Sequence, residues 1–212
     1  AENTTAVTTV TASDADLPGQ PLTFSITGGA DAARFTIDAA TGALRFLAAP
    51  DYEVPSDANV DNVYDVTVQV SDGSLTASQA IAVTVSPVND NTPAITSGGA
   101  VSVAENTTAV TTVTASDADL PAQTLTFSIT GGADAARFAI DAATGALSFL
   151  TAPDHEAPSD ANADNVYDVT VQVSDGSLTA IQAVAVAVTG TNDNAPRFTS
   201  DGGAAAVTVS VP

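Results

Sequence analysis

Hydrophobic residues recur at every second position in several short runs along the chain. The longest of these runs spans residues 64–70, where Tyr and Val alternate with Asp, Thr and Gln. Shorter runs at 22–26, 35–37, 44–46 and 81–85 repeat the pattern, and turn-forming residues such as Gly and Pro punctuate them. A period of two places alternate side chains on opposite faces of a strand. The pattern therefore predicts half-buried β-strands joined by turns.

The whole pattern occurs twice. Ala1-Glu2-Asn3-Thr4-Thr5 returns as Ala104-Glu105-Asn106-Thr107-Thr108, and residues 1–93 differ from their counterparts at only 15 positions. Each copy contains about seven short strands in roughly 100 residues, which is typical of an immunoglobulin-like β-sandwich. We therefore predict an all-β chain of two tandem seven-stranded Greek-key β-sandwich domains, with one helical turn at 31–34. Because only 5% of the residues are aromatic, we expect cores of Val, Leu and Ile.

The repeat also predicts the domain organisation. We expect a first repeat at 1–93, a second at 94–196 and the start of a third at 197–212. Segment 94–103 would be the first strand of the second repeat, and the first repeat lacks its counterpart. The alternating residues of the tail predict the first strand of the third repeat. Such a strand either frays or pairs with the open sheet edge of another molecule.

The net charge of the chain excludes some classes of binding partner. The chain has 25 acidic and 4 basic residues, for a formal net charge of −21, and no cysteine. Nucleic acids and anionic membrane surfaces require basic patches, so we expect neither as a partner, and no apolar run is long enough to insert into a membrane. Two causes of the charge stay open: solubility in a salty exterior, and the binding of cations.

Asn-Asp-Asn runs stand near the end of each copy. Val88-Asn89-Asp90-Asn91-Thr92-Pro93 is followed, one repeat later, by Asn192-Asp193-Asn194-Ala195-Pro196. These side chains compete for backbone hydrogen bonds, so such a run disfavours helix and strand interiors. It presents several oxygen atoms together instead, which suits calcium with its 6–8 oxygen ligands. We therefore predict that the centre of the chain is a calcium-clamped joint between two domains.

Six motifs follow one another in the same order in both copies: x-Glu-Asn, Asp-x-Asp, Phe-x-Ile-Asp-x-x-Thr-Gly-x-Leu, Asp-x-Glu, Tyr-x-Val-x-Val-x-x-x-Asp and Asn-Asp-Asn-x-Pro. In this order they resemble a cadherin repeat, and the resemblance covers nearly the whole chain. Stretches 49–53 and 56–64 are most similar to the cadherin-like repeats of large secreted bacterial adhesins of the RTX type.

The resemblance implies about three calcium ions at the joint. The ligands that it implies from the first repeat are Glu2, Asp51, Glu53, Asp90, the side chain of Asn89 and the backbone carbonyls of Val88 and Asn91. Those from the second repeat are Asp117, Asp119 and Asp175. Three divalent ions would offset almost all of the charge of these seven carboxylates. Without cations, carboxylates packed roughly 4–6 Å apart repel one another, and their pKa values rise.

The resemblance also implies a half-site at each end. The N-terminal one would consist of Asp14, Asp16 and Asp72. The C-terminal one would hold one or two further ions with Glu105, Asp154, Glu156, Asn192, Asp193 and Asn194.

Two further features have competing interpretations. Loops 57–61 and 160–164 share the pattern Asp-x-Asn-x-Asp, which occurs at the start of some calcium loops and also in plain Asx turns. His155 stands where the first copy has Tyr52, and we expect it to be an exposed loop residue without a catalytic or zinc-binding role.

Taken together, these features predict a non-catalytic spacer. We expect a calcium-stiffened extender repeat of an extracellular cell-surface adhesin that serves cell adhesion or biofilm formation, with neighbouring repeats of the same chain as its partners. The alternative is a module that binds a homophilic protein partner or a carbohydrate surface directly. No nucleophile or phosphate-binding motif indicates an enzyme.

Overall fold

The computed structural model describes residues 1–16 and 18–198. The strand predicted within 197–212 lies outside the described residues, except for residues 197 and 198.

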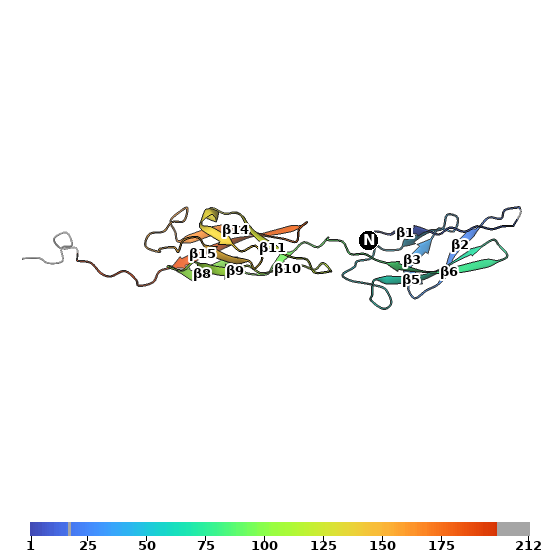
Figure 1. The fold of residues 1–212 in the computed structure, drawn as a ribbon, viewed down its shortest axis with the longest axis horizontal. Helices are drawn as coiled ribbons and strands as arrows, with labels where there is room; N and C mark the ends of the chain where they lie inside the picture. The colour runs from blue at the N-terminus through green and yellow to red at the C-terminus, as the bar shows by residue number, and fades with distance from the viewer. Residues whose placement is uncertain (17, 199–212) are drawn as a thin grey trace, which may run out of the picture. The chain divides into compact units, whose positions relative to one another are not determined.

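The first repeat folds into two antiparallel sheets of three strands each (Figure 1). One sheet has the order β1-β4-β3 and the other β2-β5-β6. The strands are β1 (Ala6–Thr9), β2 (Thr23–Gly28), β3 (Phe35–Ile37), β4 (Ala43–Phe46), β5 (Val63–Ser71) and β6 (Thr76–Thr84). The predicted helical turn is the 3₁₀ helix η1 (Ala32–Arg34).

The second repeat has seven strands in two sheets, with the orders β12-β13-β9 and β11-β14-β15-β8. A further pair, β10-β7, forms a separate two-stranded sheet. The elements are β7 (Ala94–Ile95), β8 (Ala100–Ala104), β9 (Ala109–Thr112), β10 (Ala115–Ser116), β11 (Thr126–Gly131), η2 (Ala135–Arg137), β12 (Phe138–Ile140), β13 (Ala146–Phe149), β14 (Val166–Ser174) and β15 (Thr179–Thr189). The predicted all-β, two-sheet architecture is thus confirmed.

Segment 94–103 differs from the prediction of a single strand. It forms β7 and, after Gly98 and Gly99, β8, which pairs in parallel with β15. A Cβ atom on Gly99 would lie 2.7 Å from the carbonyl oxygen of Ala183, so only glycine allows this approach. The two glycines therefore end one strand and start another, which the alternation of side chains did not reveal.

The core of the first repeat lies between its two sheets and includes three aromatic rings. Phe35 stacks on Phe46 at a centroid distance of 4.6 Å, and Tyr64 packs edge-on against Phe46 at 5.0 Å. Val66 and Val68 of β5 complete the centre, and both are at most 2% exposed. The core thus contains the expected Val and Leu together with aromatic residues, which the low aromatic content did not lead us to expect there. The second repeat contains the same arrangement of rings.

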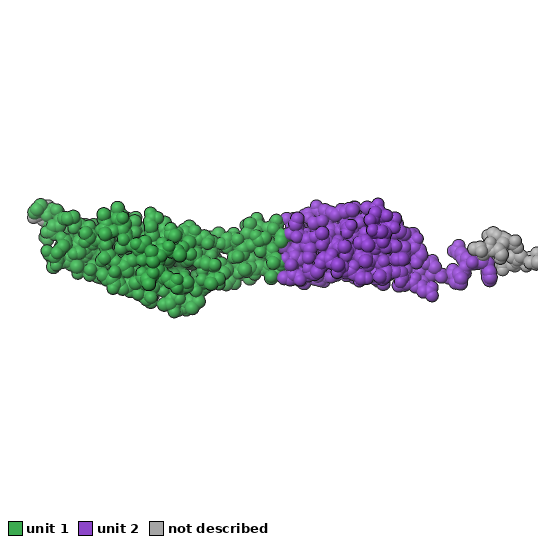
Figure 2. Space-filling view, turned by 180° about the vertical axis from the view of Figure 1, so that it is seen from behind, with its two compact units in different colours: residues 1–94, 115–125, 174–180 green, residues 95–114, 126–173, 181–212 purple. Residues whose placement is uncertain are grey.

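Contacts divide the chain into two compact units, coloured separately in Figure 2. Unit 1 comprises Ala1–Ala94, Ala115–Leu125 and Ser174–Ala180; unit 2 comprises Ile95–Thr114, Thr126–Val173 and Ile181–Pro212. Unit 1 thus includes two loop segments that belong, by sequence, to the second repeat. The repeat boundaries at 93 and 196 stay predictions, because these units are defined by contacts and not by sequence similarity.

Candidate metal centre

Glu2 anchors the first part of the centre. Its side chain is only 2% exposed and accepts two backbone hydrogen bonds, from the Val88 N–H at 2.6 Å and the Tyr52 N–H at 2.7 Å. These bonds connect the chain near Glu2 with the Asp-x-Glu loop and with the beginning of the Asn-Asp-Asn run.

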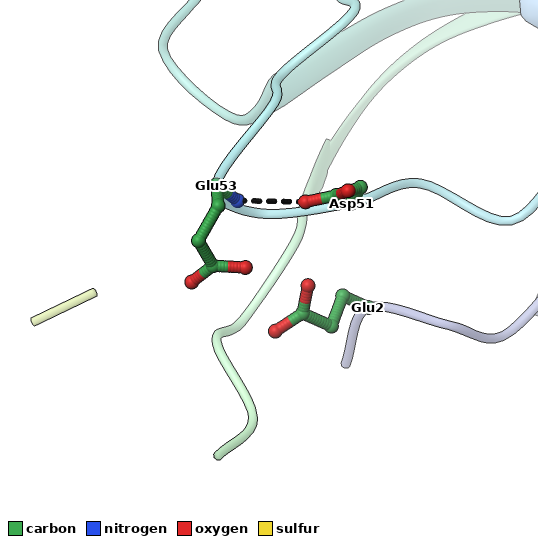
Figure 3. A group of neighbouring side chains, drawn as sticks. All are labelled: Glu2, Asp51 and Glu53. Carbon is green, nitrogen blue, oxygen red and sulfur yellow. Dashed lines mark hydrogen bonds between the residues drawn. The ribbon is translucent and has the colours of Figure 1, made fainter. Parts of the chain in front are cut away.

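The Asp-x-Glu loop closes on itself as an Asx turn. Asp51 Oδ1 accepts the N–H groups of Glu53 at 3.0 Å and Val54 at 3.1 Å. Glu2, Asp51 and Glu53 each contribute an oxygen atom to a group in which all such atoms lie within 4.8 Å of one another (Figure 3).

The Asn-Asp-Asn run adds a second group of acids, Glu53, Asp90 and Asp119. Asn91 donates to Asp119 Oδ1 from its backbone at 3.1 Å and from its side chain at 2.8 Å. Glu53 Oε1 accepts the N–H of Leu120 at 3.0 Å. The loop that carries Asp119 is therefore bound within unit 1 by hydrogen bonds to Asn91 and to Glu53.

A third group consists of Asp117, Asp119 and Asp175. The N–H of Asp119 donates to Asp117 Oδ1 at 3.0 Å. When the Asn89 amide is oriented to suit its neighbours, its nitrogen donates to Asp119 Oδ2 and Asp175 Oδ2, both at 3.2 Å. The three groups form one continuous cluster, because Glu53 belongs to the first two and Asp119 to the last two.

The charges of this cluster are incompletely compensated. Among the described residues, the buried oxygen atoms Glu53 Oε2 and Asp117 Oδ2 have no hydrogen-bond partner. Burial raises the pKa of Glu53 above its usual value, against the hydrogen bond from Leu120. Burial also opposes ionisation of Asp119, but the hydrogen bonds from Asn91 and Asp90 outweigh it and hold the pKa below its usual value. The cluster thus combines ionised carboxylates with buried oxygen atoms that lack a donor.

The second repeat forms a smaller group of Glu105, Glu156 and Asp193 within unit 2. Backbone hydrogen bonds from His155 and Thr191 lower the pKa of Glu105. Asn194 donates to Asp193 at 2.8 Å and to Glu156 at 3.2 Å. Asp154 does not join this group, although Asp51, its counterpart, belongs to the first group of unit 1.

The predicted N-terminal half-site is not gathered in the same way. Asp14 accepts the N–H of Asp16 at 2.9 Å, and a hydrogen bond to Asp14 contributes to the lowered pKa of Asp72, after the larger effects of Leu75 and Ser74. Among residues 1–16 and 18–198, however, the three carboxylates do not form a close group.

Loops 57–61 and 160–164 are Asx turns in both copies. Asp57 accepts the backbone N–H of Asp61 at 2.8 Å and of Asn62 at 3.3 Å, and Asp160 does the same one repeat later. Their carboxylates are therefore engaged by the backbone. No described residue of either loop belongs to a close acidic group.

Asn3 and Asn106 contribute as well, although the resemblance does not count them among the ligands. The side-chain amide of Asn3 donates to Asp90 Oδ2, and that of Asn106 donates to Asp193 Oδ2 at 2.6 Å. Both are the asparagine of the x-Glu-Asn motif, directly after the buried glutamate of their repeat, and this motif is the sequence signal that points to them. His155 lies in a loop, as expected, with its side chain 39% exposed and its ring against Gly190.

The donors of the unit 1 cluster suit a hard cation. Its ionisable groups are all carboxylates, without the thiolate or imidazole ligands that softer metals prefer. The two unpartnered buried oxygen atoms require a donor or a cation to offset their desolvation. The residues present therefore fit calcium, while the use of the Val88 and Asn91 carbonyls as ligands stays a prediction.

None of the helices in the part of the chain that the structure describes is long and apolar enough to cross a bilayer.

Comparison with known proteins gives a consistent result. The family model of the cadherin domain matches residues 1–86 and 100–189. Protocadherin-23 of Homo sapiens is 31% identical over 197 residues, which are 90% of this chain and 6% of that protein. Protocadherin Fat 1 of Homo sapiens is 32% identical over 86% of this chain and 4% of its own length. The chain thus spans a small part of these relatives.

Solved structures agree on the fold. Extracellular cadherin domains 3–6 of protocadherin gamma B2 match with a TM-score of 0.65 and 24% identity, over 90% of this chain and 49% of that one. The cis-dimer structure of protocadherin gammaB7 domains 3–6 matches with a TM-score of 0.62 and 23% identity, over 92% of this chain and 52% of that one.

Proposed function

Because the chain belongs to the cadherin family, whose domains form tandem repeats in extracellular adhesion proteins, we propose that it is a calcium-binding extender of such a protein. The observation that carries the proposal is the pair of buried, unpartnered oxygen atoms, Glu53 Oε2 and Asp117 Oδ2, inside one acidic cluster. A bound calcium ion would supply the positive charge that these oxygen atoms lack.

The cluster would serve as a joint because of the origin of its residues. Glu2, Asp51, Glu53 and Asp90 belong to the first sequence repeat, whereas Asp117, Asp119 and Asp175 belong to the second. Cations held by both sets would cross-link the loops at 115–125 and 174–180 to the first repeat. Without cations, repulsion between the carboxylates would loosen the same contacts.

The proposed number of calcium ions follows from the number of acidic groups. Three acidic groups that share Glu53 and Asp119 support about three ions in unit 1, and the group of Glu105, Glu156 and Asp193 supports one or two more in unit 2. Extracellular calcium modules have dissociation constants of roughly 10⁻⁴–10⁻³ M. We therefore propose that the sites fill at extracellular calcium levels and stay empty at the far lower cytosolic ones.

The biological setting belongs to the same proposal. Near-identity of two adjacent copies supports a spacer, because spacers need only be alike. We propose a non-catalytic role at a cell surface, with neighbouring repeats as the immediate partners and no nucleic-acid partner. The relatives are animal proteins, so the placement in a bacterial RTX-type adhesin of a biofilm rests on the sequence resemblance alone.

A second candidate function is direct adhesion. It is supported by the cis dimer that one similar solved structure reports. In that case two copies of the chain would associate, whereas a pure spacer would stay monomeric at all concentrations. Sedimentation velocity at rising protein concentration, in calcium, separates the two.

Small-angle scattering of the full chain tests the extender function. Calcium at several millimolar should lengthen and stiffen the particle relative to chelator, and magnesium should do so less because it favours octahedral sites with retained water. Isothermal titration calorimetry under the same conditions counts the ions. Identical scattering profiles in calcium and chelator would contradict the stiffening, and the absence of binding heat would contradict calcium binding itself.

A further inference from the structure

We propose that Asn3 and Asn106 are positioning residues, each of which orients the aspartate of its repeat's Asn-Asp-Asn run for the cation. This inference rests on the proposed calcium function and adds the residues that prepare the ligand. Neither asparagine is among the ligands that the cadherin resemblance implies.

The side-chain contact is the first support. Asn3 Nδ2 donates to Asp90 Oδ2, and Asn106 Nδ2 donates to Asp193 Oδ2 across the same separation of 87 residues. Both aspartates are exposed, and the other oxygen of each carboxylate accepts only from the adjacent asparagine of the same run, Asn91 or Asn194, among the hydrogen bonds of the described residues. An ordered carboxylate loses less rotamer freedom when a cation binds. The contact therefore lowers the entropic cost of cation binding, although the asparagine itself is not a ligand of the ion.

The backbone of the asparagine is the second support. Asn3 has φ 59° and Asn106 has φ 63°, in the left-handed region where asparagine is one of the few tolerated residues. In this conformation the N–H of Asn3 donates to the Pro50 carbonyl and that of Asn106 to the Pro153 carbonyl, both at 2.9 Å. Glycine would adopt the same backbone conformation but has no side-chain amide to donate a hydrogen bond. Asparagine therefore meets both requirements at once.

The preceding glutamate acts together with the asparagine. We call the pairs Glu2-Asn3 and Glu105-Asn106 the two-residue clip. Glu2 accepts the N–H groups of Tyr52 and Val88, and Glu105 accepts those of His155 and Thr191, at 2.6–2.7 Å. The side chains at 52 and 88 change between the copies, yet the bonds persist because they use backbone donors. Glu-Asn thus connects the Asp-x-Glu loop to the Asn-Asp-Asn run in each repeat, independently of those side chains.

The clip leaves the aspartate free to bind an ion. Asp90 Oδ2 accepts from Asn3, and Asp90 Oδ1 accepts from Asn91 at 3.1 Å. A carboxylate has about four lone-pair sites, so two amide donors leave about half of them available. The asparagines therefore hold the carboxylate from the side without occupying all of its acceptor positions.

The test compares the wild-type chain of residues 1–212 with its Asn3→Gly and Asn106→Gly variants. Glycine keeps the positive φ and removes the amide, so it isolates the side-chain contact. Because Asn3-Thr4-Thr5 and Asn106-Thr107-Thr108 match the acceptor sequence for N-glycosylation, the proteins are produced in a bacterial host so that the amides stay unmodified. Calcium affinity is measured by calorimetry, and stability is measured by thermal unfolding in chelator.

N3G should weaken calcium binding at the sites that include Asp90 by about tenfold, as expected for the loss of a hydrogen bond to a charged group. N106G should instead weaken the site that includes Asp193. In chelator, hydrogen exchange of the backbone amides at 88–92 should be faster in N3G and unchanged in N106G.

Calcium affinity within twofold of wild type in N3G, with only a lower melting temperature, would make Asn3 merely structural and would overturn the inference. If the wild type itself takes up no calcium, the proposed function fails and the inference fails with it. The two failures are therefore distinguishable in one set of titrations.

Discussion

Asp14-Ala15-Asp16 and Asp117-Ala118-Asp119 have the same sequence and different surroundings. In both, the second aspartate donates its N–H to the first, at 2.9 Å and 3.0 Å. Asp119 is nevertheless only 1% exposed and belongs to two acidic groups, whereas Asp16 is exposed and belongs to none among the described residues.

The hairpins that face these loops differ in the same way. Asp72 and Asp175 each accept two backbone N–H groups at 2.7 Å, so the turns are locally identical. Leu75 is 71% exposed, however, whereas Leu178 is half-buried. The comparison teaches that the sequence of an Asp-x-Asp loop shapes the loop, while the Asn89–Asn91 segment converts it into part of an acidic cluster.

The largest expected effect is the contrast between Asp119→Asn and Asp16→Asn. Asp119 serves two acidic groups, so removing its charge should weaken calcium binding about tenfold or more, since affinity depends on the number of charged ligands. Asp16→Asn should change the affinity less than about twofold. Calorimetry with calcium measures both, and equal losses would show that the two loops are equivalent after all.

The next largest contrast is expected between Asp90→Ala and Asp61→Ala, in the rise of the melting temperature with calcium. Saturating calcium at a hundred times the dissociation constant stabilises a protein by about 2.7 kcal/mol. Asp90→Ala should lose most of the calcium-dependent rise in melting temperature. Asp61→Ala should keep it, because Asp61 only accepts hydrogen bonds from Val63 and Asn59 within its own turn. A full calcium-dependent rise in Asp90→Ala would contradict the placement of the central ligand.

Leu178→Ala should destabilise the protein more than Leu75→Ala. Truncating a half-buried leucine removes apolar contacts and costs about 1 kcal/mol, while an exposed one stays within about 0.5 kcal/mol. Urea denaturation with calcium present measures the difference. If chelation removes it, then burial of Leu178 depends on the cations; if the leucines are equivalent in both conditions, the contrast between the hairpins is wrong.

The smallest contrast is expected between Asp38 and Asp141, whose substitution should change the stability of the protein equally. Asp38 and Asp141 each accept hydrogen bonds from the backbone and hydroxyl of a threonine, with a further contribution from an alanine N–H, which lowers the pKa of each below 3.8. A lowered pKa in the folded state stabilises the protein above the unfolded pKa, and this stability is lost as pH falls through the folded pKa.

Asp38→Asn and Asp141→Asn should therefore lower stability equally at pH 6 in chelator, and both effects should fade as pH falls below 3.8. Thermal unfolding at a series of pH values is the measurement. Unequal effects would show that the repeats also differ away from the cluster.

The strands and turns of both repeats were predictable because they depend on neighbours in sequence. Alternation over 64–70 predicted β5, and its even-numbered positions 64, 66 and 68 are buried. The break between β7 and β8 was not predictable, since it depends on the close approach of Gly99 to the Ala183 carbonyl. The aromatic centre of each core was missed because composition reports amounts and not positions.

The candidate site was predictable in its chemistry and less so in its arrangement. The cadherin resemblance implied Glu2, Asp51 and Glu53 as ligands, and the fold brings them together. It gave the same weight to Asp154, which stays outside the corresponding group of the second repeat. Asn3 belongs to the x-Glu-Asn motif, but its role was not predictable, because it arises from a contact with Asp90, 87 residues away.

The sequence by itself determined the strand period, the duplication, the all-carboxylate character of the ionisable ligands and the local Asx turns. Each of these depends on residue type and on geometry within a few positions of the chain. Only the tertiary structure decided which of two identical Asp-x-Asp loops is buried, which oxygen atoms lack a partner and which asparagine holds Asp90. The physical reason is that burial and hydrogen-bond partners are set by packing between distant segments, and identical segments that pack against different neighbours acquire different chemistry.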